Sequence, residues 1–226
     1  MAASRTPSNA PRPPAAPRIP EQLTATPLPA AGWPDDERLE GVLLDGMADD
    51  PLRARSLTIG EARGEMLDLT GAVLPRLSLH DLELRGGSLA NADLRDAGAR
   101  RVALRRVRLT GLRWTSGALD DVAFDGCRFD LGSLTASRLR RVSFSDCALN
   151  GTDLIDVQAE EVAFERCDLR EVDFTNARFR RVTMRDCRLE GARALEQLRG
   201  VQMPWSDIMA SAGVFAGALG ITLLDG

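Results

Sequence analysis

The sequence predicts an all-β solenoid of about seven square coils, and two superimposed periods in the sequence carry this prediction. In the shorter period, an apolar central residue returns at every fifth position from Ile59 to Ala194, which makes 28 consecutive repeats. An α-helix repeats its faces every 3.6 residues and a strand every 2, so a period of five fits neither. A strict period of five over this length is typical of a coil that makes one short turn per repeat.

The longer period is 20 residues, and it indicates how many repeats form one coil. The four cysteines share the small-residue position of their repeats at this interval: Cys127, Cys147, Cys167 and Cys187. Three phenylalanines share a central position in the same way: Phe124, Phe144 and Phe164. Four repeats therefore close one coil, and seven coils at the strand spacing of about 4.8 Å make a rod about 34 Å long. We expect these cysteines and phenylalanines to form a structural core ladder, because burying a large apolar side chain contributes about 1.5 to 3 kcal/mol.

Within this array, the segments SLANADLRDA, FERCDLREVDF and FTNARFRRV resemble the pentapeptide-repeat family, whose unit is usually written A(D/N)LXX. The resemblance covers residues 57–194. It implies that this region folds as a right-handed quadrilateral β-helix. It indicates little about function, because one fold hosts many functions.

The residues before the array differ from it in composition. Residues 1–34 are rich in proline, alanine and serine, which predicts a disordered leader that acts as a solubilising tail. A ligand of the PxxP type within PRPPAAP is the alternative interpretation. In residues 35–56, the apolar residues Leu39, Val42, Leu43 and Met47 recur at helical spacing, so we expect a short helical cap on the first coil.

The residues after the array, 195–226, are expected to form a helix followed by a strand. The predicted helix runs from Pro204 to Leu219 and ends at Gly220, and the strand is expected at 221–224. Four residues would share one face of the helix: Ile208, Ala212, Phe215 and Leu219. This face is expected to cover the open edge of the last coil. The family resemblance implies a second role for it, as a contact in a homodimer.

The repeat pattern argues against an enzyme or a metal site. The single histidine, His80, follows a central leucine and would face solvent, and a coil filled by its own side chains leaves no pocket for a substrate. The four cysteine sulfurs would span about 14 Å at the strand spacing, which excludes one tetrahedral zinc ion. We therefore expect no catalytic, cofactor-binding or metal-binding residues and no cofactor.

Composition predicts where the protein acts. No run of 18 apolar residues is present, so no segment is expected to span a membrane. The first 20 residues lack the apolar core of a secretory signal peptide, which favours a cytoplasmic protein. All 29 basic residues are arginine, which is typical of a GC-rich bacterial genome.

Charged residues repeat at one corner of the predicted rod. Between Leu57 and Ala194 the 22 arginines balance 22 acidic residues. Five pairs alternate in sign at intervals of 20: Arg100 and Arg101, Asp120 and Asp121, Arg140 and Arg141, Glu160 and Glu161, Arg180 and Arg181. Neighbouring coils should therefore meet with opposite charges, which specifies their register.

These observations favour a non-catalytic, rigid protein-interaction module with an unidentified protein partner. The family resemblance implies an alternative, a DNA-shape mimic that binds DNA gyrase or topoisomerase IV and protects against quinolone-like inhibitors. The acidic surface that would serve this role comprises Asp93, Asp96, Asp153, Asp156 and Asp173, interrupted by Arg95 and Arg113. The arginines between Arg100 and Arg113 could neutralise phosphates, but the lack of exposed aromatic residues beside them argues against direct nucleic-acid binding.

Overall fold

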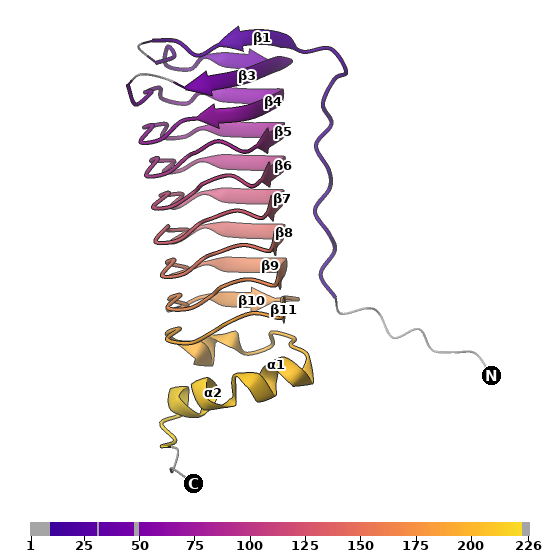
Figure 1. Cartoon of the computed structure of the whole chain (residues 1–226), viewed down its shortest axis with the longest axis vertical. Helices are drawn as coiled ribbons and strands as arrows, with labels where there is room; N and C mark the ends of the chain where they lie inside the picture. The colour runs from indigo at the N-terminus through magenta and orange to yellow at the C-terminus, as the bar shows by residue number, and fades with distance from the viewer. Residues whose placement is uncertain (1–9, 31, 48–49, 223–226) are drawn as a thin grey trace, which may run out of the picture.

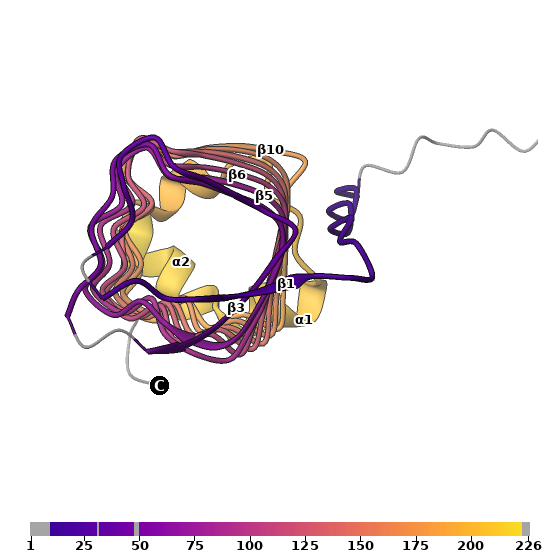
Figure 2. The same cartoon turned by 90° about the horizontal axis from the view of Figure 1, so that it is seen from above.

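The computed structural model describes residues 10–30, 32–47 and 50–222, and it shows a parallel β-solenoid of about eight turns (Figure 1). Seen from above, the stacked coils enclose a single core (Figure 2). The strands are β1 (Thr24–Pro27), β2 (Arg38–Glu40), β3 (Val42–Met47), β4 (Thr58–Asp68), β5 (Ser78–Arg85), β6 (Gly98–Arg105), β7 (Ala118–Asp125), β8 (Arg138–Ser145), β9 (Gln158–Glu165), β10 (Arg178–Arg180) and β11 (Thr183–Arg185). A 3-10 helix, η1 (Leu195–Leu198), and two short helices, α1 (Trp205–Ala210) and α2 (Ala212–Ala218), follow them.

The strands stack in the order β1-β3-β4-β5-β6-β7-β8-β9-β10, while β2 pairs with β4 and β11 with β9. From β4 onward the register advances by 20 residues per coil, so that Leu104 pairs with Phe124 and Phe124 with Phe144. The 20-residue period predicted from the sequence is thereby confirmed as one coil.

The five-residue period arises from corners with a left-handed backbone. Arg101, Arg106 and Asp121 have φ values of 52°, 53° and 57°, and this conformation returns at nearly every fifth residue through the array. In β6 the hydrogen-bonded register skips Arg101, so that one strand covers two sides of the coil. Because a left-handed residue other than glycine costs about 1 to 2 kcal/mol, packing in the core must offset the strain of the corners.

The core ladder has the register that the sequence predicts. The rings of Phe124 and Phe144 stack with centroids 4.7 Å apart, and those of Phe144 and Phe164 lie 5.0 Å apart. All four cysteines are buried and free. Their thiols donate to backbone carbonyls, as Cys127 does to Leu104 O at 3.3 Å. The cysteines therefore act as small core residues, as expected.

The largest fully buried side chain, Trp114, occupies a central position because a neighbouring glycine leaves room for it. Its Nε1 donates a 3.0 Å hydrogen bond to Ala97 O, and it is 1% exposed. A Cβ atom on Gly117 would lie 2.6 Å from both Ala97 O and Trp114 Cδ1. Gly132 has the same relationship to Phe129, with a Cβ atom 2.3 Å from the ring. The interior is thus filled by matched large and small residues.

The prediction of a helical cap at residues 35–56 is wrong, because this segment already belongs to the solenoid. β2 and β3 lie within it and pair in parallel with β4. Leu44 occupies a central position at 1% exposure, and Gly41 and Gly46 are corner residues with φ values of 64° and 94°. The apolar spacing fits a helix as well as a coil, but the two glycines at five-residue spacing favour the corners of a coil.

The prediction of a disordered leader is also wrong for the part of residues 1–34 that the structure describes. β1 pairs with β3 and extends the sheet. Residues 10–20 follow the outside of the rod, running opposite to the direction in which the coils stack (Figure 1). Seen from above, this segment is a narrow coil beside the wall (Figure 2). Residues 1–9 lie outside the described residues.

The predicted C-terminal helix forms, but it is divided at Ser211 into α1 and α2. Asp207 and Ser211 are buried against the rod, and the Asp207 carboxylate accepts a 2.6 Å hydrogen bond from the backbone N–H of Asp186. This contact supplies an acceptor to the edge of the last coil, where the next coil is missing.

The face of the helix that packs therefore differs from the predicted one. Phe215 packs against the core and Ile208 is half-buried, whereas Ala212 and Leu219 are exposed. Ile221 and Thr222 are not in a strand, and the remainder of the predicted strand at 221–224 lies outside the described residues. Within the described part of the chain, no helix has the length and apolar character needed to span a membrane.

Candidate interaction surfaces

One corner of the solenoid carries the predicted ladder of charged pairs. The strand register stacks Arg100 on Asp120, Asp120 on Arg140, and Glu160 on Arg180. The second residue of each pair is the left-handed corner residue. Opposite charges therefore meet on neighbouring coils, and the register predicted from the alternation of charge is confirmed.

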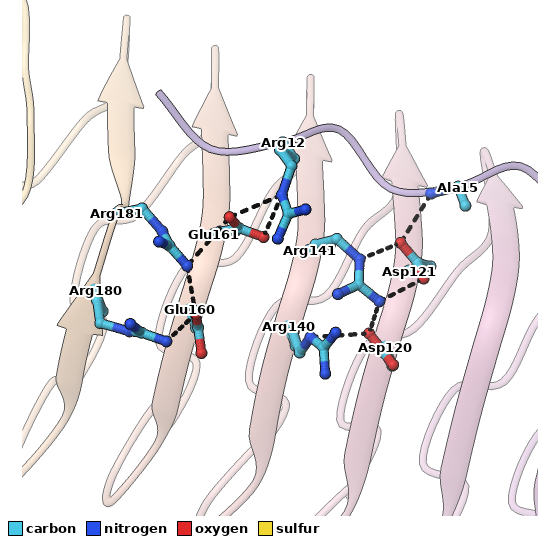
Figure 3. A network of polar contacts seen from close by, with 10 residues as sticks. All are labelled: Arg12, Ala15, Asp120, Asp121, Arg140, Arg141, Glu160, Glu161, Arg180 and Arg181. Carbon is cyan, nitrogen blue, oxygen red and sulfur yellow. Dashed lines mark hydrogen bonds and ion pairs between the residues drawn. The ribbon is translucent and has the colours of Figure 1, made fainter. Parts of the chain in front are cut away.

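The unit formed by Asp120, Asp121, Arg140 and Arg141 shows how these charges are held (Figure 3). Arg141 donates from Nε to Asp121 Oδ1 at 2.7 Å and from Nη2 to Asp121 Oδ2 at 2.7 Å. The same guanidinium also contacts Asp120. The Arg141 side chain is only 15% exposed and that of Asp121 11%. Such a two-point contact is stronger than an exposed ion pair, because the guanidinium fork matches the carboxylate and little water competes.

The ion pairs fall into units of two coils. In each unit an arginine contacts the acidic residue one coil before it: Arg101 with Asp81 at 2.6 Å, Arg141 with Asp121 at 2.7 Å, and Arg181 with Glu161 at 3.2 Å. At this corner, no ion pair among the described residues joins one unit to the next. The corner therefore presents three equivalent acidic groups, two coils apart.

The leader contacts each of these three acidic groups through one residue. The Arg12 side chain donates from Nε to Glu161 Oε1 at 3.0 Å. The backbone N–H of Ala15 donates to Asp121 Oδ1 at 3.0 Å, and that of Arg18 donates to Asp81 Oδ1 at 2.8 Å. Figure 3 shows the leader crossing the corner at Arg12 and Ala15. The sequence indicated a PxxP-type ligand within PRPPAAP as an alternative, but it did not predict that this segment contacts the rod; the prolines at every third position from Pro11 to Pro20 are the signal for this contact.

These contacts keep the three acidic groups ionised. The hydrogen bond from Arg101 lowers the pKa of Asp81, and that from Arg141 lowers the pKa of Asp121. The pKa of Glu161 is lowered mainly by its hydrogen bond with Arg12 of the leader. An ionised carboxylate is the stronger acceptor for a backbone N–H, so the ladder arginines and the leader support one another.

The predicted acidic surface lies on another side of the rod, and the structure divides it. Asp93 and Asp173 are buried and paired, Asp93 with Arg95 and Arg113 and Asp173 with Arg193. In contrast, Asp96 and Asp156 are exposed and Asp153 is half-buried. These three residues have no ion pair with any described residue. Asp153 and Asp173 pair on adjacent coils, so like charges meet there.

The outer wall carries the single histidine, and the interior contains a small apolar cavity. His80 lies on the wall, with Nε2 3.1 Å from Glu40 Oε1 and Nδ1 3.7 Å from Asp81 Oδ2. The apolar cavity inside the N-terminal coils measures only about 20 Å³ and is lined by leucines and Trp114. In the described ranges, no three His, Cys, Asp or Glu side chains are grouped to hold a metal ion.

The C-terminal helices expose large apolar side chains. Trp205 is 76% exposed and Met209 57% exposed, one turn apart on α1. Leu219 and Ile221, which follow α2, are 74% and 54% exposed. Of these, only Leu219 belongs to the face predicted from the sequence, because the buried Asp207 and Ser211 turn Trp205 and Met209 outward.

Comparisons with known proteins identify a repeat family within the solenoid. The family model described as pentapeptide repeat region matches residues 117–193. Curated protein sequences gave no match. Among solved structures, the chain is similar to a trypsin-treated variant of QnrB1, a plasmid-mediated fluoroquinolone resistance protein, at 16% identity and a TM-score of 0.35, covering 85% of this chain and 100% of that one.

A second similar structure is HetL from the cyanobacterium Nostoc sp. strain PCC 7120, a pentapeptide repeat protein involved in heterocyst differentiation regulation. The identity is 16% and the TM-score 0.29, covering 76% of this chain and 91% of that one. At such low identities and TM-scores these likenesses carry no argument about function. The family model therefore identifies residues 117–193 of the solenoid as a pentapeptide-repeat region.

Proposed function

We propose that this protein is a rigid, non-catalytic interaction module and that its C-terminal helices form the contact surface. The observation that supports this proposal is the exposure of Trp205 and Met209, side by side on α1. Tryptophan is enriched among the residues that contribute most to protein interfaces, and a large exposed apolar side chain costs free energy until a partner covers it.

The partner that we assign to this surface is a second copy of the chain. A surface at the end of a rod can meet its own copy about a two-fold axis, so that Trp205 of each chain packs beside Met209 of the other. Leu219 and Ile221 would extend the same contact. The filled interior supports a structural role for the rod itself, as a rigid support for the C-terminal contact surface.

Sedimentation velocity over a range of concentrations tests this proposal. We expect the wild type to form dimers and the double variant Trp205→Ser, Met209→Ser to remain monomeric. Leu131→Ser is the matched control, because Leu131 is 70% exposed on the solenoid wall, away from α1. A wild type that stays monomeric at every concentration, or a control that dissociates like the double variant, would contradict the dimer.

The second candidate function is binding to a type II topoisomerase in place of DNA. It is favoured by the carboxylates of Asp96, Asp153 and Asp156, which have no partner arginine among the described residues. A protein that replaces DNA must offer unneutralised negative charge to a basic surface. The rest of the rod favours this candidate less, since most of its acids are paired.

A supercoiling assay with bacterial DNA gyrase, with and without a quinolone, tests the second candidate. The protein should inhibit or protect the enzyme at stoichiometric amounts, and the triple variant Asp96→Asn, Asp153→Asn, Asp156→Asn should not. Changing three exposed acids of another column, Asp45, Glu65 and Asp125, to their amides is the matched control. No effect of the wild type, or equal effects of the two triple variants, would exclude this use of the acidic surface.

A further inference from the structure

The leader has the sequence and spacing of a polyproline II helix. Proline stands at every third position, Pro11, Pro14, Pro17 and Pro20, and a polyproline II helix has three residues per turn. The first three of these prolines are half-buried, whereas Arg12, Ala15 and Ala16 are exposed. One edge of the helix therefore packs against the rod.

The period of the leader matches the period of the ladder. Residues 12, 15 and 18, three apart, contact Glu161, Asp121 and Asp81, which are 40 residues or two coils apart. Three residues of polyproline II rise about 9.3 Å, and two coils rise about 9.6 Å. The difference of about 0.3 Å per turn is small beside the tolerance of a hydrogen bond. Successive turns of the leader therefore meet successive acidic groups in the same way.

The wall beneath the leader provides room for proline rings. One column of outward positions carries only small residues from β6 to β11: Ala103, Ala123, Ser143, Ala163 and Thr183. Pro11 and Pro14 line a groove together with Ser143, Ala163 and Thr183. Acidic groups on the corner and small residues on the wall thus form one continuous strip along the rod.

Most of the contacts depend on conformation rather than on particular side chains. Two of the three contacting residues, Ala15 and Arg18, donate from backbone N–H groups, which every residue except proline can supply. In the pattern Pro-x-x repeated three times, the donor directly follows each proline. Any polyproline II segment with this pattern could make the same contacts, and an arginine at the first donor position would add the contact with Glu161.

The leader can also dissociate from the wall of the rod without exposing the core. The Arg12 side chain is 69% exposed, and Ala15 and Arg18 are exposed. Its release would uncover carboxylates that the ladder arginines already hold, so that the rod would stay folded. Displacement by a competing segment therefore costs little beyond the leader's own contacts.

We propose that this strip is a binding site for proline-rich segments in the polyproline II conformation. The leader is its resident ligand, and a proline-rich segment of a partner protein with the same pattern binds by displacing it. The leader thereby keeps the site closed to segments that fit less well. Recognition of a preformed extended helix has a low entropic cost, which suits a site built on a rigid wall.

The experiment uses the full-length chain and a fluorescent peptide with the sequence of residues 10–20. In one variant, Ala15→Pro removes the N–H donor to Asp121 and weakens the resident leader. In the matched variant, Ala16→Pro favours the same conformation but removes an N–H that has no hydrogen-bond acceptor among the described residues. We expect the peptide to bind the Ala15→Pro chain about tenfold more tightly than the Ala16→Pro chain, as for loss of one hydrogen bond to a carboxylate.

The same two substitutions in the peptide test recognition directly. Against the Ala15→Pro chain, the peptide with Ala16→Pro should bind as the unchanged peptide does, and the peptide with Ala15→Pro should bind much more weakly. Equal affinity of the two peptides, or no binding of either, would overturn the proposal. Thermal unfolding checks that both chains are folded, and each should still unfold in one cooperative transition because the substitutions lie outside the core.

Sedimentation of the same samples identifies the source of the natural ligand. If the Ala15→Pro chain binds peptide without a change in its oligomeric state, a segment of another protein fits the site. If the leaders of two copies are exchanged instead, the wild type forms a dimer that the peptide dissociates, and the assignment to a partner protein is overturned. A dimer through α1 would resist the peptide, so this outcome is distinct from the dimer proposed above.

Discussion

The backbone N–H of Ala15 donates a 3.0 Å hydrogen bond to Oδ1 of Asp121, which lies 106 residues later in the sequence. The same oxygen accepts a 2.7 Å hydrogen bond from Nε of Arg141. One carboxylate therefore joins the leader to two neighbouring coils. Asp81 and Glu161 repeat this arrangement with Arg18 and Arg12. The ladder that holds the register of the coils also positions the leader.

The first prediction concerns Arg141. We expect Arg141→Gln to lower the free energy of unfolding by about 1 to 3 kcal/mol, because it leaves the buried Asp121 carboxylate without its main partner. Urea denaturation measures this change. Arg100→Gln is the control, since Arg100 is exposed and has no ion pair with any described residue. Equal losses of unfolding free energy in the two variants would contradict the stabilising role of the two-point contact between Arg141 and Asp121.

The second prediction concerns the stability of the fold at acidic pH. The pKa of Asp81 and of Asp121 lies below the usual 3.8 in the folded protein. A depressed pKa contributes stability above the pKa of the unfolded chain, and this contribution is lost as the pH falls through the folded value. Stability should therefore be flat between about pH 5 and 8 and fall below about pH 4.

Amide hydrogen exchange measures the same acid effect at the leader. The amides of Ala15 and Arg18 should be protected near neutral pH and lose protection in acid, while that of Ala16 should exchange fast throughout. Rates must be corrected for the intrinsic effect of pH. Protection of Ala15 that persists after the carboxylates are protonated would contradict the role given to Asp121.

The third prediction concerns the phenylalanine ladder. Phe144→Ala should lower the free energy of unfolding by about 3 to 5 kcal/mol, because Phe144 stacks on both Phe124 and Phe164 and the cavity cannot collapse between rigid coils. Leu131→Ala, at an exposed corner, should change it by less than about 0.5 kcal/mol. Thermal and urea unfolding compare the two. Similar effects would contradict the register of the core.

The fourth prediction concerns two glycines with ordinary φ values. Gly117→Ala should destabilise the protein by about 1 to 3 kcal/mol, because the new methyl group would meet Ala97 O and the Trp114 ring at 2.6 Å. Gly98→Ala should be neutral or stabilise by up to about 1 kcal/mol, since no atom lies within 4 Å of its Cβ position. A stability assay in which both variants behave alike would contradict the packing described for Trp114.

Most of the solenoid could be predicted from the sequence, because the residues that determine the fold of each repeat lie within that repeat. The central residue, the small residue two positions before it and the corner residue recur within five positions, so the pattern of burial is local and visible. The alternation at residues 120, 140 and 160 likewise indicates which coils lie next to each other. The segment around Leu44 was wrongly predicted as a helix, because its short apolar pattern also fits a helix and Gly41 and Gly46 were not recognised as corners.

The sequence by itself determined the period, the core ladder and the stacking of charges, since these depend on residues that are neighbours within a coil or one coil apart. Only the tertiary structure decided how the ends meet the rod. The leader binds Asp121 because two coils and three residues of polyproline II have nearly equal rise, a match of lengths between segments over 100 residues apart. The C-terminal helix turns Asp207 inward and Trp205 outward because the last coil leaves a backbone N–H that needs an acceptor, and only the assembled solenoid has such an edge.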